Sequence, residues 1–170
     1  MKRFINLLFP LLFGVVLSLT GCVTIKPPQW RAVDETREAQ YEPYLGEGTG
    51  SITGQAFLTQ MGGGVVTAAG RVVTLDPATD IGTEWWTKAG IYYVHKGLVP
   101  PSASFLKARK TTTADAEGRF KFENLRPGKY YIRTEVTWYV GYNIQGGLVG
   151  QLVEVKSDKT VELIINQYAH

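Results

Sequence analysis

Few residues of this sequence belong to the types that carry out covalent or acid–base chemistry. The sequence contains one cysteine, Cys22, and two histidines, His95 and His170. A serine–histidine–acid arrangement would have to use His95, and no serine stands in the Gly-x-Ser-x-Gly setting of a nucleophile elbow. Histidine and glutamate do not recur at the helical spacing of zinc ligands. We therefore expect no enzyme activity, no metal ion and no cofactor. The one enzymatic alternative that the sequence leaves open is sugar hydrolysis, which needs only a pair of carboxylates.

Cys22 stands at the end of a segment that is typical of export signals. Two basic residues precede an apolar stretch over residues 4–19, which is shorter than a membrane-spanning helix and ends in small residues. The stretch closes with Leu19-Thr20-Gly21-Cys22, which resembles the lipobox of bacterial lipoproteins. The resemblance implies a signal peptide over residues 1–21, cleavage after Gly21 and a lipid on the Cys22 thiol. Two or three acyl chains would make a lasting membrane anchor.

Removal of the signal changes what the composition implies. The formal net charge falls from +3 to +1 when Lys2 and Arg3 are lost, which does not favour nucleic acid as a partner. With its only thiol acylated, the chain would form no disulfide, so packing has to stabilise the fold. The residue after the cysteine guides the sorting of such lipoproteins, and Val23 is not the Asp that resembles an inner-membrane retention signal. We expect a lipid-anchored protein of the outer membrane that faces the periplasm, while surface display stays open.

Seven aromatic residues form the candidate binding patch of the sequence. They gather in two segments and are Trp85, Trp86, Tyr92, Tyr93, Trp138, Tyr139 and Tyr142. Neighbouring residues of an extended chain point to opposite sides, so one ring of each adjacent pair could be exposed. Exposed aromatic rings mark partner surfaces, and sugar rings stack on them. We favour the alternative that the first segment folds over a sheet and forms a small core of its own, because large aromatic side chains are mostly buried.

The elements that must position these residues are strands. Residues 22–50 contain Pro27-Pro28, a polar run and several glycines, which predict a flexible tether after the lipidated cysteine. From Ser51 onward, short runs rich in Val, Ile, Thr, Tyr and Phe alternate with turns. The predicted strands are 51–58, 70–76, 89–95, 105–114, 119–123, 129–138, 148–156 and 160–166. The pattern predicts an all-β sandwich of about seven or eight strands over residues 51–167.

Residues 112–136 hold the most specific pattern of the chain. Asp115 can cap a tight turn with its carboxylate, Gly118 can supply a positive φ, and Pro127-Gly128 can turn the chain again. The spacing Asp-x-x-Gly-x-Phe-x-Phe-x-x-Leu-x-Pro-Gly-x-Tyr-x-Ile resembles the carboxypeptidase-regulatory-like domains. The resemblance implies a prealbumin-like Greek-key sandwich with an accessory, adhesive or structural role, and it implies no reaction. Residues 76–110 depart from the family pattern, because a long insertion replaces a short hairpin.

Together these features predict a non-catalytic envelope lipoprotein that acts as a binding or structural module. Its expected partners are the membrane, through the lipid on Cys22, and an unidentified envelope protein. The alternative is a glycan-binding module that uses the aromatic patch, and a hydrolase with two carboxylates is the third hypothesis. Exposure of the tryptophan rings distinguishes the glycan hypothesis from the interpretation as a small core.

Overall fold

The computed structural model describes residues 35–87 and 102–169, and these residues form the predicted two-sheet sandwich with eight strands. The first sheet contains β1 (Gly50–Thr59), β2 (Val65–Thr67), β5 (Arg119–Leu125) and β8 (Thr160–Ile165). The second sheet contains β3 (Val72–Pro77), β4 (Lys110–Thr113), β6 (Gly128–Val140) and β7 (Asn143–Val155). The predicted signal peptide, Gly21, Cys22 and the strand predicted at residues 89–95 lie outside the described residues.

β1 is the central strand of the first sheet. It pairs antiparallel with β5 and, on its other side, parallel with β8, so the first and last strands of the sandwich are neighbours. The end of β1 forms a hairpin with β2. The second sheet has the order β4-β3-β6-β7, and all of its pairs are antiparallel.

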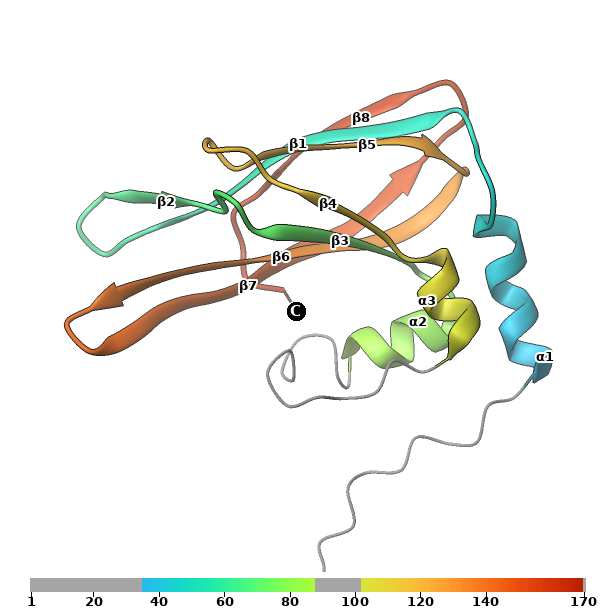
Figure 1. The fold of residues 1–170 in the computed structure, drawn as a ribbon, viewed down its shortest axis with the longest axis horizontal. Coiled ribbons are helices and arrows are strands. Elements are labelled where there is room, and N and C mark those ends of the chain that lie inside the picture. The colour runs from blue at the N-terminus through green and yellow to red at the C-terminus, as the bar shows by residue number, and fades with distance from the viewer. Residues whose placement is uncertain (1–34, 88–101, 170) are drawn as a thin grey trace, which may run out of the picture.

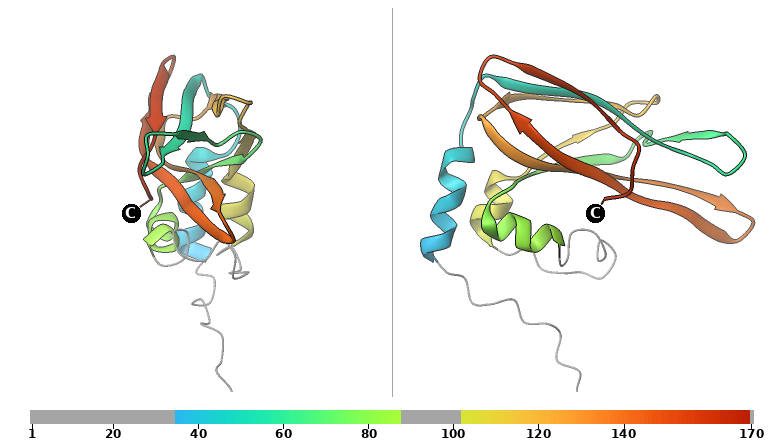
Figure 2. Two further views of the ribbon diagram at one scale, coloured as in Figure 1. Left: turned by 90° about the vertical axis from the view of Figure 1, so that its left-hand side faces the viewer. Right: turned by 180° about the vertical axis from the view of Figure 1, so that it is seen from behind.

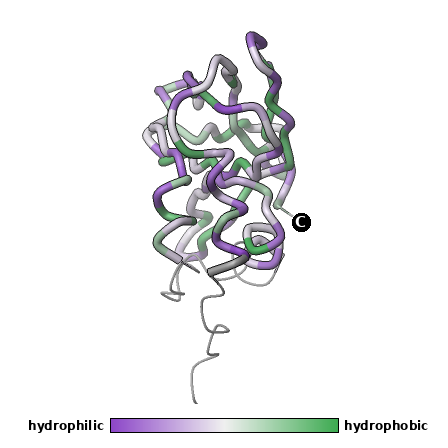
Figure 3. The backbone as a smooth tube through the Cα atoms, turned by 90° about the vertical axis from the view of Figure 1, so that its right-hand side faces the viewer, coloured by the Kyte–Doolittle hydropathy of each residue, from purple (hydrophilic) through white to green (hydrophobic). Residues whose placement is uncertain are grey.

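The main core lies between the two sheets and follows the alternation predicted from the sequence. Along β5, Phe120 and Phe122 are buried, whereas Arg119 and Lys121 are exposed. Figure 3 shows the same change between hydrophobic and hydrophilic residues at short intervals along the backbone. The buried residues include Ile52, Val73, Leu75, Leu125, Tyr130, Ile132, Val136, Val149 and Ile165. A strand that buries every second side chain thus contributes one face to this core.

Short helices gather at one end of the sandwich, and two hairpins extend from the opposite end (Figures 1 and 2). The helices are α1 (Glu35–Glu38), the 3-10 helix η1 (Ala39–Tyr44), α2 (Asp80–Trp85) and α3 (Ala103–Ala108). Tyr41, Trp85, Phe105 and Ala108 bury their side chains together in a second, smaller core between these helices. Within the described ranges, no helix is long and apolar enough to cross a membrane.

Two predictions need correction at this helical end. The flexible tether predicted for residues 22–50 is helical over residues 35–44, because Tyr41 packs against side chains of α2 and α3 that lie far away in the sequence. The strand predicted at residues 105–114 is a helix up to Ala108 and a strand only over Lys110–Thr113. The backbone N–H of Phe105 donates to the Ser102 hydroxyl at 3.1 Å, which caps this helix.

Candidate functional site

The structure describes five of the seven predicted patch residues, and these five differ in exposure. Trp85 and Trp86 are 6% and 3% exposed, so they do not belong to an exposed patch, as the small-core interpretation expects. Tyr92 and Tyr93 lie outside the described residues. The second segment is different, because Trp138 is half-buried, Tyr139 is 72% exposed and Tyr142 is fully exposed. Among the patch residues that the structure describes, exposed rings are found only in this second segment.

A buried cluster of charges encloses Trp85 between the helices and the second sheet. The Asp76 carboxylate accepts hydrogen bonds from Arg109 at 2.6 and 2.9 Å, and its Oδ2 lies 3.6 Å from Nη2 of Arg133. The guanidinium carbons of Arg109 and Arg133 lie 5.4 and 4.3 Å from the centre of the Trp85 ring, as in cation–π contacts. Burial lowers the pKa of Arg133 to about 10, and the Asp76 carboxylate acts in the opposite direction. With Asp76 only 2% exposed, the cluster fixes the helices to the sheet rather than opening a binding site.

Trp86 covers part of the outer face of the second sheet. Its ring stacks on the ring of Tyr131 in β6, with the ring centres 4.6 Å apart and the planes 11° from parallel. Gly150 in β7 makes room for it, because a Cβ at Gly150 would lie 2.9 Å from the Trp86 ring. The small-core interpretation expected both rings to be buried over a sheet, but it did not identify their partners, because contacts with residues far away in the sequence are not revealed by local spacing.

The exposed rings belong to a two-stranded ribbon that β6 and β7 form beyond β3. The two strands pair without interruption from Gly128 and Val155 to Val140 and Asn143, whereas β3 pairs with β6 only as far as Arg133. We name residues 138–145 the ribbon tip. The two-residue loop at its end has a φ of +60° at Gly141, as type II′ hairpin turns require at their first central position.

The ribbon tip carries apolar and amide side chains on both of its faces. Tyr139 stands directly opposite Ile144, and both side chains are exposed. Trp138 stands opposite Gln145 on the other face. Its ring lies against Gly146, where an added Cβ would be 2.8 Å from the nearest ring atom. Tyr142 follows Gly141 in the loop and projects into solvent. The tip thus combines aromatic rings with the amides of Asn143 and Gln145.

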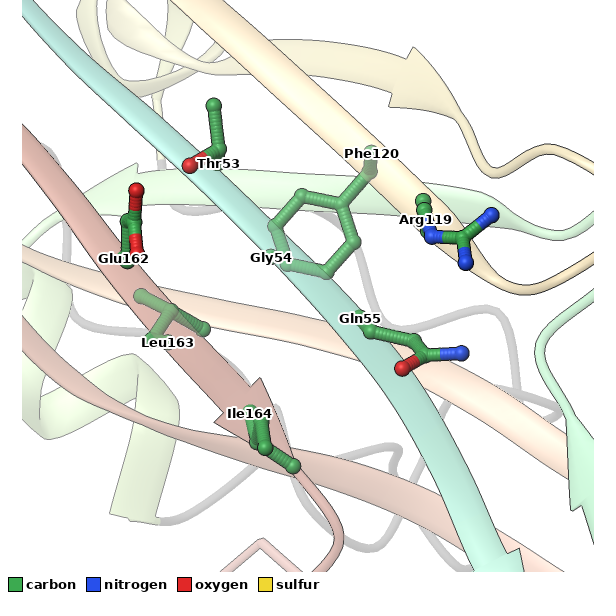
Figure 4. A pocket seen from close by; sticks show the side chains of 8 residues that line it. All are labelled: Thr53, Gly54, Gln55, Arg119, Phe120, Glu162, Leu163 and Ile164. Atoms are coloured by element: carbon green, nitrogen blue, oxygen red, sulfur yellow. The ribbon is translucent and has the colours of Figure 1, made fainter.

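A shallow groove of about 730 Å³ lies on the outer face of the first sheet (Figure 4). Its outward-facing side chains come from three neighbouring strands and are Thr53, Gln55, Arg119, Glu162 and Ile164. Gln55 donates from Nε2 to the carbonyl oxygen of Glu117 at 2.7 Å, which orients its amide. The lining contains one carboxylate, that of Glu162, whereas glycoside hydrolysis uses two. The groove can exchange hydrogen bonds with a polar ligand, but its lining has no exposed aromatic ring.

The predicted turn residues lie in tight connections of the sandwich. Oδ1 of Asp115 accepts hydrogen bonds from the backbone N–H groups of Glu117 and Arg119 at 3.0 and 2.7 Å, and Gly118 has a φ of +76°. Pro127 is exposed, and Gly128 begins β6 against the ring of Tyr44. The turn therefore accounts for Asp115 without an ion. In the part of the chain that the structure describes, no three His, Cys, Asp or Glu residues form a group that could hold a metal ion.

Comparisons with known proteins agree with this architecture. Residues 90–169 match the family model SpaA, described as a prealbumin-like fold domain. A crystal structure from Pseudomonas aeruginosa, described as a "putative carbohydrate binding protein", is similar over 79% of this chain and 97% of that chain, with a TM-score of 0.61 and 26% identity. The minor pilin GBS52 of Streptococcus agalactiae aligns over 71% of this chain and 44% of that chain, with a TM-score of 0.39 and 18% identity. No curated protein sequence matches. The sandwich has the prealbumin-like fold.

Proposed function

We propose that this protein is a non-catalytic carbohydrate-binding module of the bacterial envelope, held at a membrane by a lipid on Cys22. The observation that carries the proposal is the structural similarity to the Pseudomonas aeruginosa protein, which extends over 97% of that chain at 26% identity. Because a fold alone does not determine a function, the proposal also needs a suitable surface. Both the ribbon tip and the polar groove provide groups that recognise sugars, namely aromatic rings and hydrogen-bonding side chains.

Binding of the acylated full chain in detergent micelles to saccharides tests this function directly. The probes are insoluble peptidoglycan, in a sedimentation assay, and a soluble N-acetylglucosamine tetrasaccharide, in titration calorimetry. We expect saturable binding to at least one of them and none to double-stranded DNA, because the net charge after loss of the signal is only +1. Absence of binding to both saccharides would contradict the proposal.

The non-catalytic part of the proposal has its own measurement. The tetrasaccharide is expected to stay intact during prolonged incubation, since the groove places one carboxylate, Glu162, where hydrolysis needs an acid and a second carboxylate. New reducing ends that disappear in a Glu162→Gln variant would show that the protein is a hydrolase instead.

Anchoring through Cys22 is tested by fractionation of cells. A Cys22→Ser variant cannot form the thioether, so we expect it to leave the membrane fraction, whereas the unchanged chain stays in that fraction. The protein itself should incorporate labelled fatty acid only when Cys22 is present. Membrane retention of the Cys22→Ser chain would mean that another part of the protein binds the membrane.

A protein partner is the second candidate function, and the edges of the ribbon favour it. Among the described residues, β6 has no strand neighbour except β7 beyond Arg133. A free edge of this kind can accept a further strand through main-chain hydrogen bonds. A photoreactive amino acid at Thr137 or Gln145 should then form one discrete cross-linked product in cells, and the same label at Leu106 on α3 serves as the control.

A further inference from the structure

We infer that the ribbon tip is the saccharide-binding surface and that it points away from the membrane anchor. The inference rests on the proposed function and adds the site, the ligand class and the orientation. The ligand class is an uncharged saccharide, recognised by stacking on tyrosine rings and by hydrogen bonds to side-chain amides.

The charge distribution points to an uncharged ligand. Residues 136–153 contain no Asp, Glu, Lys, Arg or His, and Glu135 and Glu154 are the first charged residues on either side. The tip thus has no cation that would attract an anionic polymer and no carboxylate that would attract a cationic one. The tip exposes the rings of Tyr139 and Tyr142, the amides of Asn143 and Gln145, and the aliphatic side chains of Val140 and Ile144. Rings cover the apolar faces of sugars, while amides donate to and accept from hydroxyl groups.

The ribbon holds these groups in place before a ligand arrives. The pairing between β6 and β7 is unbroken, and the loop at the end contains only Gly141 and Tyr142. Arg71 fastens the base of the ribbon, because its Nη2 donates to the Thr137 hydroxyl at 3.0 Å and its Nη1 lies 3.8 Å from Glu135. A surface that is already ordered loses less conformational entropy on binding.

The orientation follows from the way the N-terminal helices attach to the sandwich. Gln40 and Asp80 exchange two hydrogen bonds, of 3.2 and 3.0 Å, and Arg37 lies 3.5 Å from Glu84. Tyr41 is buried in the second core. The chain that comes from Cys22 is therefore fixed to the helical end, and the ribbon tip lies at the opposite end (Figures 1 and 2). A lipid on Cys22 then leaves the tip facing away from the membrane.

A lipid surface is the competing occupant of this end of the molecule. The β1–β2 hairpin extends beside the ribbon and exposes Met61 and Val65, and residues 48–70 are also free of charged side chains. Two apolar tips could enter a bilayer together. The saccharide is favoured because the proposed anchor is attached at the helical end and because a similar structure is described as a "putative carbohydrate binding protein". Lipid binding is therefore an outcome that the experiment has to distinguish.

The test compares a Tyr139→Ser/Tyr142→Ser double variant with matched controls, using the tetrasaccharide as the probe. Both rings are exposed, so the variant should fold normally, which its unfolding curve verifies. We expect its affinity to fall about tenfold or more, as for the loss of central aromatic contacts. A Leu106→Ser control on the exposed face of α3 and a Gln55→Ala/Glu162→Ala control in the groove should bind like the unchanged chain. A Tyr142→Trp variant, which keeps an aromatic ring, should retain binding.

The outcomes separate the two proposals. If the unchanged chain binds and the tyrosine variant binds within twofold of it, the ribbon tip is not the site, although carbohydrate binding stands. Loss of binding in the groove variant alone would move the site to the groove. If the unchanged chain binds no saccharide, the proposed function itself fails. Sedimentation of the Cys22→Ser chain with phosphatidylethanolamine–phosphatidylglycerol vesicles, abolished by the tyrosine substitutions, would show that the tip binds lipid and would overturn the saccharide assignment.

Discussion

At the residue scale, the Asp76 carboxylate connects the second sheet with the helical end of the molecule. It belongs to β3, and it holds Arg109, which follows α3, and Arg133, which belongs to β6. Both arginines also lie on the Trp85 ring. A carboxylate that is buried and shared by two guanidinium groups is far more important for stability than an exposed partner of one lysine.

Removal of this charge should destabilise the protein strongly. We expect an Asp76→Asn substitution to lower the free energy of unfolding by about 3–5 kcal/mol, because two largely buried cations lose their shared carboxylate. Urea unfolding followed by circular dichroism measures the change. Lys121→Gln is the matched control, since Lys121 and Glu123 form an exposed pair at 2.6 Å that contributes at most about 1 kcal/mol. Equal effects of the two substitutions would contradict a structural role of the cluster.

The buried hydroxyl of Tyr41 predicts a loss of stability at alkaline pH. Burial raises the pKa of Tyr41 to about 12, and the Thr79 side chain opposes this shift, although no hydrogen bond of normal geometry joins the two hydroxyls. An unfolded tyrosine ionises near pH 10, so this contribution to stability is complete below pH 10 and disappears as the pH rises toward 12.

A Tyr41→Phe variant should lack this part of the alkaline loss. Near pH 8 its free energy of unfolding should be at least that of the unchanged protein, because the substitution removes a buried hydroxyl that has no hydrogen-bond partner. The decrease between pH 10 and 12 should be smaller by roughly 2–3 kcal/mol. Tyr130, whose pKa is also raised by burial, contributes equally to both proteins and cancels in the comparison. Denaturant unfolding at several pH values gives the difference, and parallel curves for the two proteins would refute the prediction.

At the element scale, the helices depend on tertiary contacts because they are too short to be stable alone. α2 and α3 have six residues each, whereas isolated helices need about 12–15 residues to be even marginally stable. Each begins at a capped residue: the Thr79 hydroxyl accepts from the N–H of Gly82 at 2.9 Å, and the Ser102 hydroxyl accepts from Phe105. Capping and the second core together keep these segments helical.

Loss of a cap should therefore be measurable. We expect Ser102→Ala to lower the free energy of unfolding by about 1 kcal/mol, within the usual range of 0.5–2 kcal/mol for such caps. Ser102→Asp preserves an acceptor and should restore stability. Amide hydrogen exchange at Phe105 should become faster in the alanine variant and remain slow in the aspartate variant. Faster exchange in both would indicate that packing rather than capping limits the opening of α3.

At the scale of the whole molecule, the helical end and the ribbon tip face in opposite directions (Figure 1). Thirteen peptide units separate Cys22 from Glu35, where α1 begins, and they can span at most about 45 Å. β6 alone has 13 residues and extends about 43 Å, if each residue contributes about 3.3 Å. If Cys22 is acylated as proposed, we expect the helical end, where this segment attaches, to lie nearer to the membrane than the tip.

Fluorophore labelling of the acylated protein in vesicles measures this orientation. Cys22 is the only cysteine, and in the proposed acylated protein its thiol is blocked by the lipid, so a cysteine introduced by Leu106→Cys or Tyr142→Cys is the only reactive thiol. Nitroxide lipids should quench a label at residue 106 more strongly than one at residue 142. Stronger quenching at residue 142 would mean that the domain turns its tip toward the bilayer.

The sequence by itself determined the features that depend on neighbouring residues. The alternation of Phe120 and Phe122 with Arg119 and Lys121 predicted the strand and its inward face, because the side-chain period of a strand is two. The spacing around Asp115 and Gly118 predicted a turn, since a carboxylate and a positive φ act within a few residues. These local rules, together with the family resemblance, were sufficient for the sandwich and its prealbumin-like fold.

Only the tertiary structure decided which aromatic residues are buried and which are exposed. Trp85 and Tyr139 are both large aromatic residues next to another aromatic residue in the sequence, so their residue type and neighbours do not show which of them is exposed. Trp85 is buried because α2 meets α3, Tyr41 and the charge cluster, whereas Tyr139 is exposed because β6 and β7 continue beyond β3. Burial is a property of contacts between segments far apart in the chain, and hydrophobic stabilisation follows the area that those contacts remove from water. For this physical reason the strands and turns could be predicted from the sequence, but the exposed aromatic surface could not.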